Sequence, residues 1–321
     1  MPEIIDLPEG DLIDAPGFYR IPLSVHHSQP CVGPSVTSGV LRRMELQTPA
    51  DVWAFHQLNP NRWPSEDKPA LRMGRAMASL IEGGVQELEK HFTVVPENAP
   101  RRPDVRQLKA YEEGRASDVA KESIEFWAAL DRDTRDVLPA AEWELIVTMG
   151  GVLTQDPAAS AVMAGLPEMT LAWQDEATGI WVLSRPDTVS FDGAVSDYKK
   201  MSARGGSFDY RLVDRNITQH GYDMQLGLAA EGLERLTGHW PASVGIVAQS
   251  DKPPHSVLLR EILEEDLRIG QWRNHRAIRR FHECLASGYW PGPGADTGAY
   301  QRPEWQRTTL LDEMNTANAA P

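Results

Sequence analysis

The spacing of apolar positions changes along the chain and divides it into a mainly helical first half and a strand-rich second half. Between residues 74 and 92 apolar side chains recur at close to helical spacing, which predicts a long amphipathic helix. Further helices are expected over residues 117–130 and 140–153. Shorter ones are predicted near Ser35–Ser38, after Thr48-Pro49 and at Asp156-Pro157.

From Glu168 onward the period shortens to two, as expected for strands. Met169 to Trp173 alternates, and Ile180 to Phe191 is long enough for a central strand. Asp192-Gly193 is typical of a hairpin turn and leads into a strand over residues 194–199. The remaining predicted elements are a helix over 217–236, strands over 243–248 and 257–261, and a long helix through Trp272 to Leu285.

This order of elements predicts an α/β fold whose sheet begins antiparallel. The acidic residues 1–16 are expected to form a disordered tail. One large domain is expected over residues 17–290, with a mainly helical part at 17–165 and a sheet core at 166–290. The Gly- and Pro-rich residues 291–321 are expected to form a C-terminal tail.

The composition is typical of a soluble globular protein, with 41% hydrophobic and 24% charged residues. Neither a long apolar run nor a basic segment before an apolar stretch occurs, so no membrane span and no secretory signal are expected. The two cysteines, Cys31 and Cys284, are far apart, which argues against a disulfide framework or a thiolate metal site. We therefore expect a reducing, cytoplasmic location. The sequence has no phosphate-binding loop and no dinucleotide fingerprint, so no nucleotide cofactor is expected.

Two aspartates and a lysine fall on the two strands that the hairpin joins. Asp197 and Lys199 share one face of their strand because alternate residues point the same way, and the turn brings the mid-strand Asp187 beside them. Burying two carboxylates together is unfavourable without a cation. With Glu168 upstream, the set fits metal-assisted cleavage of a phosphodiester, in which carboxylates bind a hard divalent cation. The alternative is a surface strand with an ordinary Asp–Lys pair.

The net charge of −14 argues against nonspecific coating of nucleic acid, although a local basic groove can coexist with an acidic exterior. Acidic residues alternate with the basic residues that follow the candidate site, so an ordinary solvated loop is the alternative to such a groove there. Arg42-Arg43 and Arg101-Arg102 are further candidates for phosphate contacts. The basic residues expected along the DNA backbone after the site are Lys200, Arg204, Arg211 and Arg215.

The same residues carry a resemblance to the PD-(D/E)xK nuclease superfamily. Arg185-Pro186-Asp187 and Asp197-Tyr198-Lys199, with Glu168–Thr170 before them and Tyr222–Gln225 after them, look like a nuclease domain of the RecE (exonuclease VIII) type. Weaker similarity at the flanks extends the resemblance to roughly residues 20–305. It implies a restriction-endonuclease-like core, in which a mixed central sheet is flanked by helices, behind a helical N-terminal half.

The resemblance also implies a metal centre. Asp187 and Asp197 would bind Mg²⁺, or Mn²⁺ in its place. Glu168 would be a further acidic ligand, directly or through water, and the backbone carbonyl of Tyr198 an additional one. Lys199 would position or activate the attacking water and stabilise charge at the phosphate.

Two other residues receive roles in the same way. Gln225 would orient a site residue or a DNA phosphate, the alternative being an exposed helical glutamine. Arg185 is counted with the residues expected to contact DNA.

The chain departs from the resembled pattern at two places. Family members usually carry a histidine ligand on the early helix, where this chain has Ala78. This change could weaken one metal site or let Glu82 substitute. Leu228 and Ala229 stand where the later helix often has a glutamine followed by an aromatic residue.

Together these features lead us to expect a Mg²⁺-dependent DNA exonuclease of phage or prophage type. By resemblance it would resect linear double-stranded DNA from 5′ ends and leave 3′ single-strand tails for recombination. The expected partners are duplex ends, a RecT-type annealing protein and further copies of the chain in a ring, without a membrane. The alternatives are an endonuclease or single-strand nuclease of the same fold, or a catalytically weakened DNA-binding or assembly module.

Overall fold

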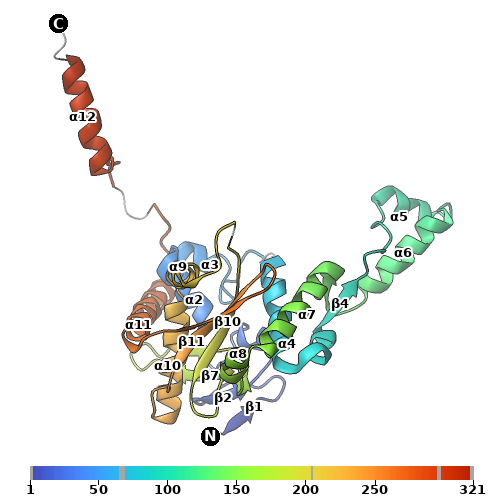
Figure 1. Cartoon of the computed structure of the whole chain (residues 1–321), viewed down its shortest axis with the longest axis horizontal. Coiled ribbons are helices and arrows are strands. Elements are labelled where there is room, and N and C mark those ends of the chain that lie inside the picture. The colour runs from blue at the N-terminus through green and yellow to red at the C-terminus, as the bar shows by residue number, and fades with distance from the viewer. Residues whose placement is uncertain (1–2, 65–68, 204, 295–297, 319–321) are drawn as a thin grey trace.

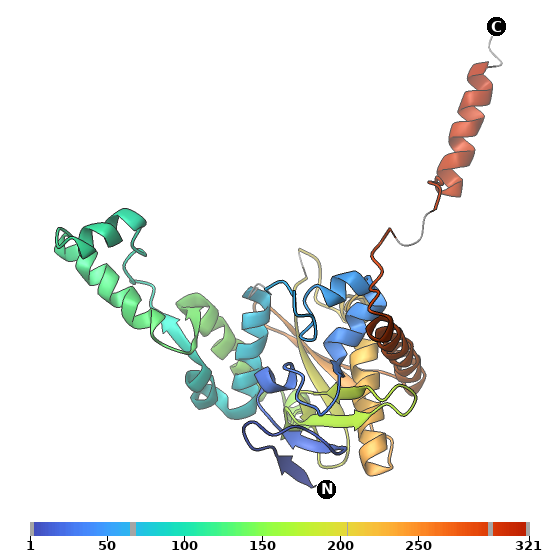
Figure 2. The same cartoon turned by 180° about the vertical axis from the view of Figure 1, so that it is seen from behind.

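The computed structural model describes residues 3–64, 69–203, 205–294 and 298–318. A body of two mixed sheets and their covering helices carries two projections (Figures 1 and 2). One is an arm formed by residues 92–139, and the other is the C-terminal helix.

The first sheet has the strand order β1-β2-β7-β8-β3. β1 pairs parallel with β2 and β3 parallel with β8, while β2, β7 and β8 are mutually antiparallel. The sheet is therefore mixed. Its strands are β1 (Ile4–Asp6), β2 (Gly17–Arg20), β3 (Ser35–Thr37), β7 (Thr170–Gln174) and β8 (Trp181–Ser184).

The second sheet has the order β12-β11-β10-β9-β6 and is also mixed. β10 pairs antiparallel with β9 through the predicted hairpin and parallel with β11, which pairs antiparallel with β12. The strands are β6 (Leu166–Pro167), β9 (Thr188–Val189), β10 (Val195–Met201), β11 (Val244–Ser250) and β12 (Val257–Glu261).

Helices cover both faces of the second sheet. On one side α10 packs against α11 and α2, and its apolar residues join the main core with β7, β8 and β11. On the other side α4 and α7 pack over Tyr198 and Val247 in a second cluster. The helices of the body are α1 (Leu23–His26), α2 (Ser38–Leu46), α3 (Pro49–Trp53), α4 (Pro69–His91), α7 (Ala140–Gln155), α8 (Pro157–Val162), α9 (Tyr210–His220), α10 (Tyr222–Thr237) and α11 (Glu264–Ser287).

The arm begins where β4 (Phe92–Val95) pairs parallel with β5 (Asp136–Pro139), and α5 (Val105–Glu112) and α6 (Asp118–Asp131) form its outer end. The helix α12 (Glu304–Asn318) stands away from the body in both views. No helix in the described ranges is long and apolar enough to cross a membrane.

Most predicted elements are confirmed, including the capped helix after Thr48. The long helix predicted over residues 74–92 is interrupted, because Gly83 and Gly84 within α4 do not have helical φ and ψ angles. Three further predictions are wrong. Residues 3–16 are not a disordered tail, because β1 pairs with β2 and Ile13 is completely buried. The strand expected from Ile180 to Phe191 is two strands in different sheets. Pro186 breaks it, since proline lacks the N–H of the ladder and restricts the residue before it.

The third correction concerns residues 210–237, where one helix was expected from residue 217. Two helices, α9 and α10, occupy this segment and meet at Gly221. Gly221 has a φ of 65°, in the left-handed region that favours glycine. The turn at Gly221 directs the first residues of α10 toward β10.

Candidate functional site

Asp187 lies in the break between β8 and β9, not in the middle of a strand as predicted. Thr188 pairs with Ser196 across the antiparallel β9–β10 ladder, so the preceding Asp187 lies next to Asp197. The Oδ2 of Asp187 accepts a hydrogen bond of 2.6 Å from the backbone N–H of Tyr198. The hairpin therefore brings the two predicted carboxylates together, although the strand that was expected to carry the first of them ends before it.

Asp197 is almost fully buried and lies on the face of β10 that looks toward α10. The side-chain amide of Gln225 donates a hydrogen bond of 2.7 Å to its Oδ1. The ammonium of Lys199 forms an ion pair with its Oδ2, although this oxygen accepts no hydrogen bond of regular geometry. The predicted roles of Gln225 in orienting a site residue and of Lys199 as a neighbouring cation fit this arrangement.

Glu168 precedes β7 and is joined to Asp187 through the backbone. Its own N–H donates to the carbonyl of Asp187 at 3.1 Å, and its φ is 52°. Its carboxylate accepts a hydrogen bond of 2.6 Å from Nε of Arg185, and both side chains are largely buried. Arg185 also donates to the carbonyl of Ile21. The guanidinium of Arg185 thus holds Glu168 and the β2–α1 connection, and its expected contact with DNA stays a prediction.

The buried carboxyls have perturbed pKa values. Burial, reinforced by the negative charge of Asp197, raises the pKa of Asp187 well above its usual value, while Lys199 opposes the shift. Burial also raises the pKa of Glu168, against the opposing effect of Arg185. A cation bound next to these carboxyls would favour their charged forms and so lower both pKa values.

Lys199 remains a cation in this environment. Burial acts to lower its pKa, but Asp197 and Asp187 outweigh burial, and the net pKa is raised. Its Nζ also lies 5.1 Å from the centre of the Tyr222 ring. The ammonium is therefore suited to stabilise negative charge, and less suited to accept a proton.

A cavity of about 550 Å³ opens on the Glu168 side of the site. Ala78 and Glu82 of α4 line it together with Glu168 and Arg185. The negative charge of Glu82 adds to the elevated pKa of Glu168. The early helix therefore faces the site as the sequence suggested, with Ala78 in place of a ligand and Glu82 one turn away.

A second cavity, of about 820 Å³, opens on the Tyr222 side. Arg42 and Arg43 give its lining a basic character, and none of the lining residues within the described ranges is acidic. Nε of the half-buried Arg42 has no hydrogen-bond partner. In a chain of net charge −14 this cavity is a local positive region. Its arginine and histidine lining residues are Arg42, Arg43, His27, His56 and His220. Burial lowers the pKa of His27 and lowers that of His56 to about 4, so the positive charge comes mainly from the two arginines.

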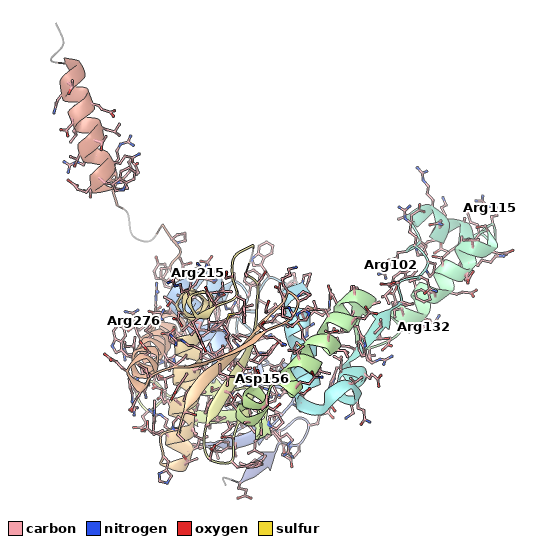
Figure 3. The ribbon with its side chains drawn as sticks, viewed as in Figure 1. Arg102, Arg115, Arg132, Asp156, Arg215 and Arg276 are labelled. Carbon is pink, nitrogen blue, oxygen red and sulfur yellow. The ribbon has the colours of Figure 1, made fainter. Side chains whose placement is uncertain are left out.

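The other predicted DNA contacts fall in three places. Arg211 and Arg215 are exposed on α9, and Lys200 is half-buried on β10. Figure 3 labels Arg215. Arg204 lies outside the described residues. Arg102 is on the arm, far along the chain's long axis from Arg215 (Figure 3), and its guanidinium pairs with Asp131.

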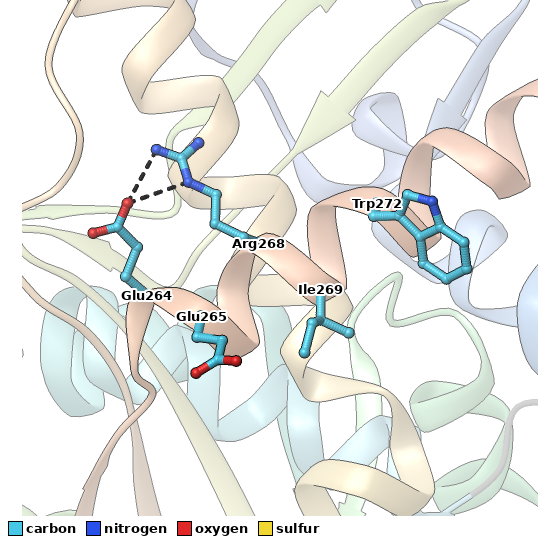
Figure 4. A pocket seen from close by; sticks show the side chains of 5 residues that line it. All are labelled: Glu264, Glu265, Arg268, Ile269 and Trp272. Atoms are coloured by element: carbon cyan, nitrogen blue, oxygen red, sulfur yellow. Dashed lines mark hydrogen bonds and ion pairs between the residues drawn. The ribbon is translucent and has the colours of Figure 1, made fainter.

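The sequence did not predict the histidines of the basic cavity. It also did not predict the buried contact between Nδ1 of His26 and the hydroxyl of Thr170, at 3.0 Å, although the same hydroxyl accepts a hydrogen bond from Arg185. These residues come from distant parts of the chain, and only the His26-His27 doublet could have signalled them. A further pocket lies outside the site, on the outer face of α11 (Figure 4). It is lined by Glu264, Glu265, Arg268, Ile269 and Trp272.

The residues present fit a cation site with two carboxylates better than one with three. Asp187 and Asp197 are neighbours, and the buried Oδ2 of Asp197 forms an ion pair with the Lys199 ammonium. Glu168 is held by Arg185. Across the described ranges, no group of three or more His, Cys, Asp or Glu is arranged to hold a metal ion. Mg²⁺ commonly uses one or two carboxylates and keeps several waters, so the pair suffices for it.

Comparison with known proteins bears on the fold. No family model and no curated protein matches the sequence. Among solved structures, the chain is similar to the crystal structure of a "putative exonuclease" from Eubacterium rectale, with a TM-score of 0.59 and 12% identity. The similarity covers 90% of this chain and 98% of that chain. The shared fold extends over nearly the whole of both proteins and confirms the mixed α/β class.

Proposed function

We propose that the protein is a metal-dependent deoxyribonuclease of the PD-(D/E)xK type. The observation that carries the proposal is the arrangement of Asp187, Asp197 and Lys199 on one hairpin. Two neighbouring carboxylates and an ammonium group are the set that phosphodiester hydrolysis needs. The shared fold with a structure named as an exonuclease is consistent with it.

Each side chain has a role in the proposed reaction. Asp187 and Asp197 would hold Mg²⁺, and Mn²⁺ would substitute. Bound there, the ion would polarise the phosphate and make a bound water more acidic. Gln225 fixes the orientation of Asp197 through its hydrogen bond. Lys199, as a cation, would stabilise the charge that develops at the phosphate.

The remaining contributions are less direct. Glu168, held by Arg185, would act on the ion through water, and the Tyr198 carbonyl would be an additional ligand. The phosphates of the substrate would enter by the basic cavity that Arg42 and Arg43 line.

The finer proposal is an exonuclease that resects linear duplex DNA from 5′ ends and leaves 3′ single-strand tails for recombination. Its partners would be duplex ends, a RecT-type annealing protein and other copies of the chain in a ring. These points rest on the resemblance of the motifs around Asp187 and Asp197, and on the absence of a phosphate-binding loop in the sequence.

Digestion of end-labelled linear duplex in Mg²⁺ tests this function, with covalently closed circular DNA as the parallel substrate. We expect the linear form alone to be degraded and EDTA to stop the reaction. Lys199→Ala and Asp197→Ala should each reduce the rate by about 10²–10⁴-fold. Full activity of Lys199→Ala would contradict the assignment, and cutting of the circle would favour an endonuclease.

One observation favours a second candidate, a DNA-binding module with weakened catalysis. The Glu168 carboxylate is paired with Arg185, and Ala78 offers no ligand, so the centre has fewer metal ligands than the resembled family implies. Such a module would bind duplex DNA without degrading it in either Mg²⁺ or Mn²⁺. A gel-shift and a digestion under the same buffer conditions separate the two functions.

A further inference from the structure

Tyr222 lies beside two cations of the site. The Nζ of Lys199 is 5.1 Å from the centre of its ring, and the Cζ of Arg42 is 5.7 Å from the same centre. Lys199 comes from β10, Arg42 from α2 and Tyr222 from the start of α10. The ring thus lies where the two-carboxylate centre meets the basic cavity, which Tyr222 and Arg42 both line.

The backbone holds this ring in place. Gly221, with a φ of 65°, turns the chain from α9 into α10 directly before Tyr222. Arg42 donates from Nη1 to the carbonyl of His220 at 3.2 Å, so α2 is fastened to the same turn. The half-buried Tyr222 also packs against the main core. Its position is therefore set by three elements and does not depend on Lys199.

Lys199 needs such a support because its other partner is shared. Its ammonium ends a flexible four-carbon stem and pairs with Asp197. Asp197 is also a proposed ligand of the divalent cation, which would repel an ammonium group and compete for the same oxygen. An aromatic face attracts an ammonium group but offers a hard divalent cation no oxygen ligand. The ring is thus a partner that metal binding would leave available.

We propose that Tyr222 is a positioning residue for Lys199, whose ammonium it holds beside Asp197 when a divalent cation occupies the centre. This inference rests on the proposed nuclease function for its meaning, but the contact itself can be measured without activity. The aromatic ring carries the effect, so Tyr222→Phe should retain most of it and Tyr222→Leu should lose it.

The test measures Lys199 directly. In full-length protein labelled with ¹³C-lysine, the Cε resonance of Lys199 is identified by its disappearance in Lys199→Arg and is titrated with pH. A cation–π contact favours the charged amine, so we expect the pKa of Lys199 to fall by about half to one unit in Tyr222→Leu. In Tyr222→Phe the fall should be clearly smaller. The matched control is Tyr210→Leu. Tyr210 lies on α9, and its ring centre is 5.4 Å from the Cζ of Arg260 on β12, so this variant removes an equivalent contact elsewhere in the protein.

Kinetics on linear duplex then separate the two proposals. For Tyr222→Leu we expect kcat to fall at least tenfold with little change in KM, and Tyr222→Phe should stay within about threefold of the wild type. An unchanged Lys199 titration in Tyr222→Leu overturns the positioning role, whether or not the protein cleaves DNA. If the wild type does not cleave DNA but the titration shifts as described, the contact stands and the nuclease function fails.

Discussion

At the scale of single residues, the centre contains a carboxyl group, that of Asp187, whose charged form is destabilised by the surrounding protein. Asp187 is half-buried next to the charge of Asp197, and its raised pKa means that folding favours its protonated form. The N–H of Tyr198 and the ammonium of Lys199 only partly oppose this effect. A destabilised charged carboxylate of this kind is typical of a functional site, here one that would bind a cation.

We expect Asp187→Asn to stabilise the metal-free protein at neutral pH. A carboxyl whose pKa is higher in the folded than in the unfolded chain stabilises the fold below its unfolded pKa of about 4, and this contribution is lost as the pH rises through the folded pKa. Asparagine does not titrate and can still accept the Tyr198 hydrogen bond. The variant should therefore melt above the wild type at pH 8, with a difference that shrinks toward pH 4.

Thermal unfolding in EDTA at several pH values checks this expectation, and a stability change of 1 kcal/mol moves the midpoint by about 2–4 °C. Asp11→Asn, at an exposed position of the N-terminal segment, is the control. A midpoint below that of the wild type at pH 8 would show that the fold needs the charge of Asp187 rather than suffering from it.

The sequence predicted that Asp187, Asp197 and Lys199 lie close together, because their proximity follows from local rules. A two-residue turn and the alternation of side chains suffice to bring Asp187 toward Asp197 and Lys199. It did not predict the partner of Glu168 or the ring beside Lys199. Arg185, Tyr222 and Arg42 reach their positions through packing between elements, which no short spacing in the chain encodes.

At the scale of elements, the close crossing of α10 and α11 places the site residues of α10. A Cβ added at Gly270 would lie 2.3 Å from the carbonyl oxygen of Asp223, and one at Gly227 would lie 2.6 Å from that of Leu267. Both obstacles are backbone atoms. The two glycines thus let the helices approach closely enough for the first turn of α10 to reach β10.

Gly270→Ala should therefore force the helices apart and destabilise the protein by about 1–3 kcal/mol, the usual cost of overpacking. The matched control is Gly151→Ala in α7, where an added Cβ meets no atom within 4 Å. That change should stabilise the protein by about 0.5–1 kcal/mol through helix propensity. Urea unfolding of both variants measures the difference, and equal stabilities would show that the crossing is loose.

Elements were harder to predict than residues. The segment 180–191 is long enough for one central strand, yet Pro186 sends its two halves into different sheets, and the described strands form two five-stranded sheets in place of one continuous central sheet. The N-terminal residues were expected to be disordered because they are acidic. Pairing with β2 and burial of Ile13 order them, and both depend on tertiary contacts that local composition does not reveal.

At the scale of the whole molecule, an acidic protein carries a basic entrance to its centre. The net charge of −14 would repel DNA at long range, whereas the cavity lined by Arg42 and Arg43 would attract it locally. Burial lowers the pKa of both arginines, and Arg42 and Arg43 also repel each other. Phosphate groups would relieve that repulsion, so binding should depend on these two residues and on salt.

Replacing Arg42 or Arg43 with glutamine should weaken duplex binding and lower the slope of log affinity against log salt by about 1 each. Fluorescence anisotropy with a labelled duplex in Ca²⁺, at several salt concentrations, measures both quantities. Arg102→Gln, on the arm and paired with Asp131, should change neither. Equal effects at all three positions would contradict the proposal that DNA binds at the cavity lined by Arg42 and Arg43.

Titration of the metal-free protein with Mn²⁺, followed by electron paramagnetic resonance, tests the central claim most directly. The wild type should bind Mn²⁺, and Asp187→Asn and Asp197→Asn should each weaken binding by roughly tenfold or more, while Asp214→Asn on α9 should not. Equal binding by the wild type and all three variants, or no binding by the wild type, would contradict the assignment of these two carboxylates as a metal centre.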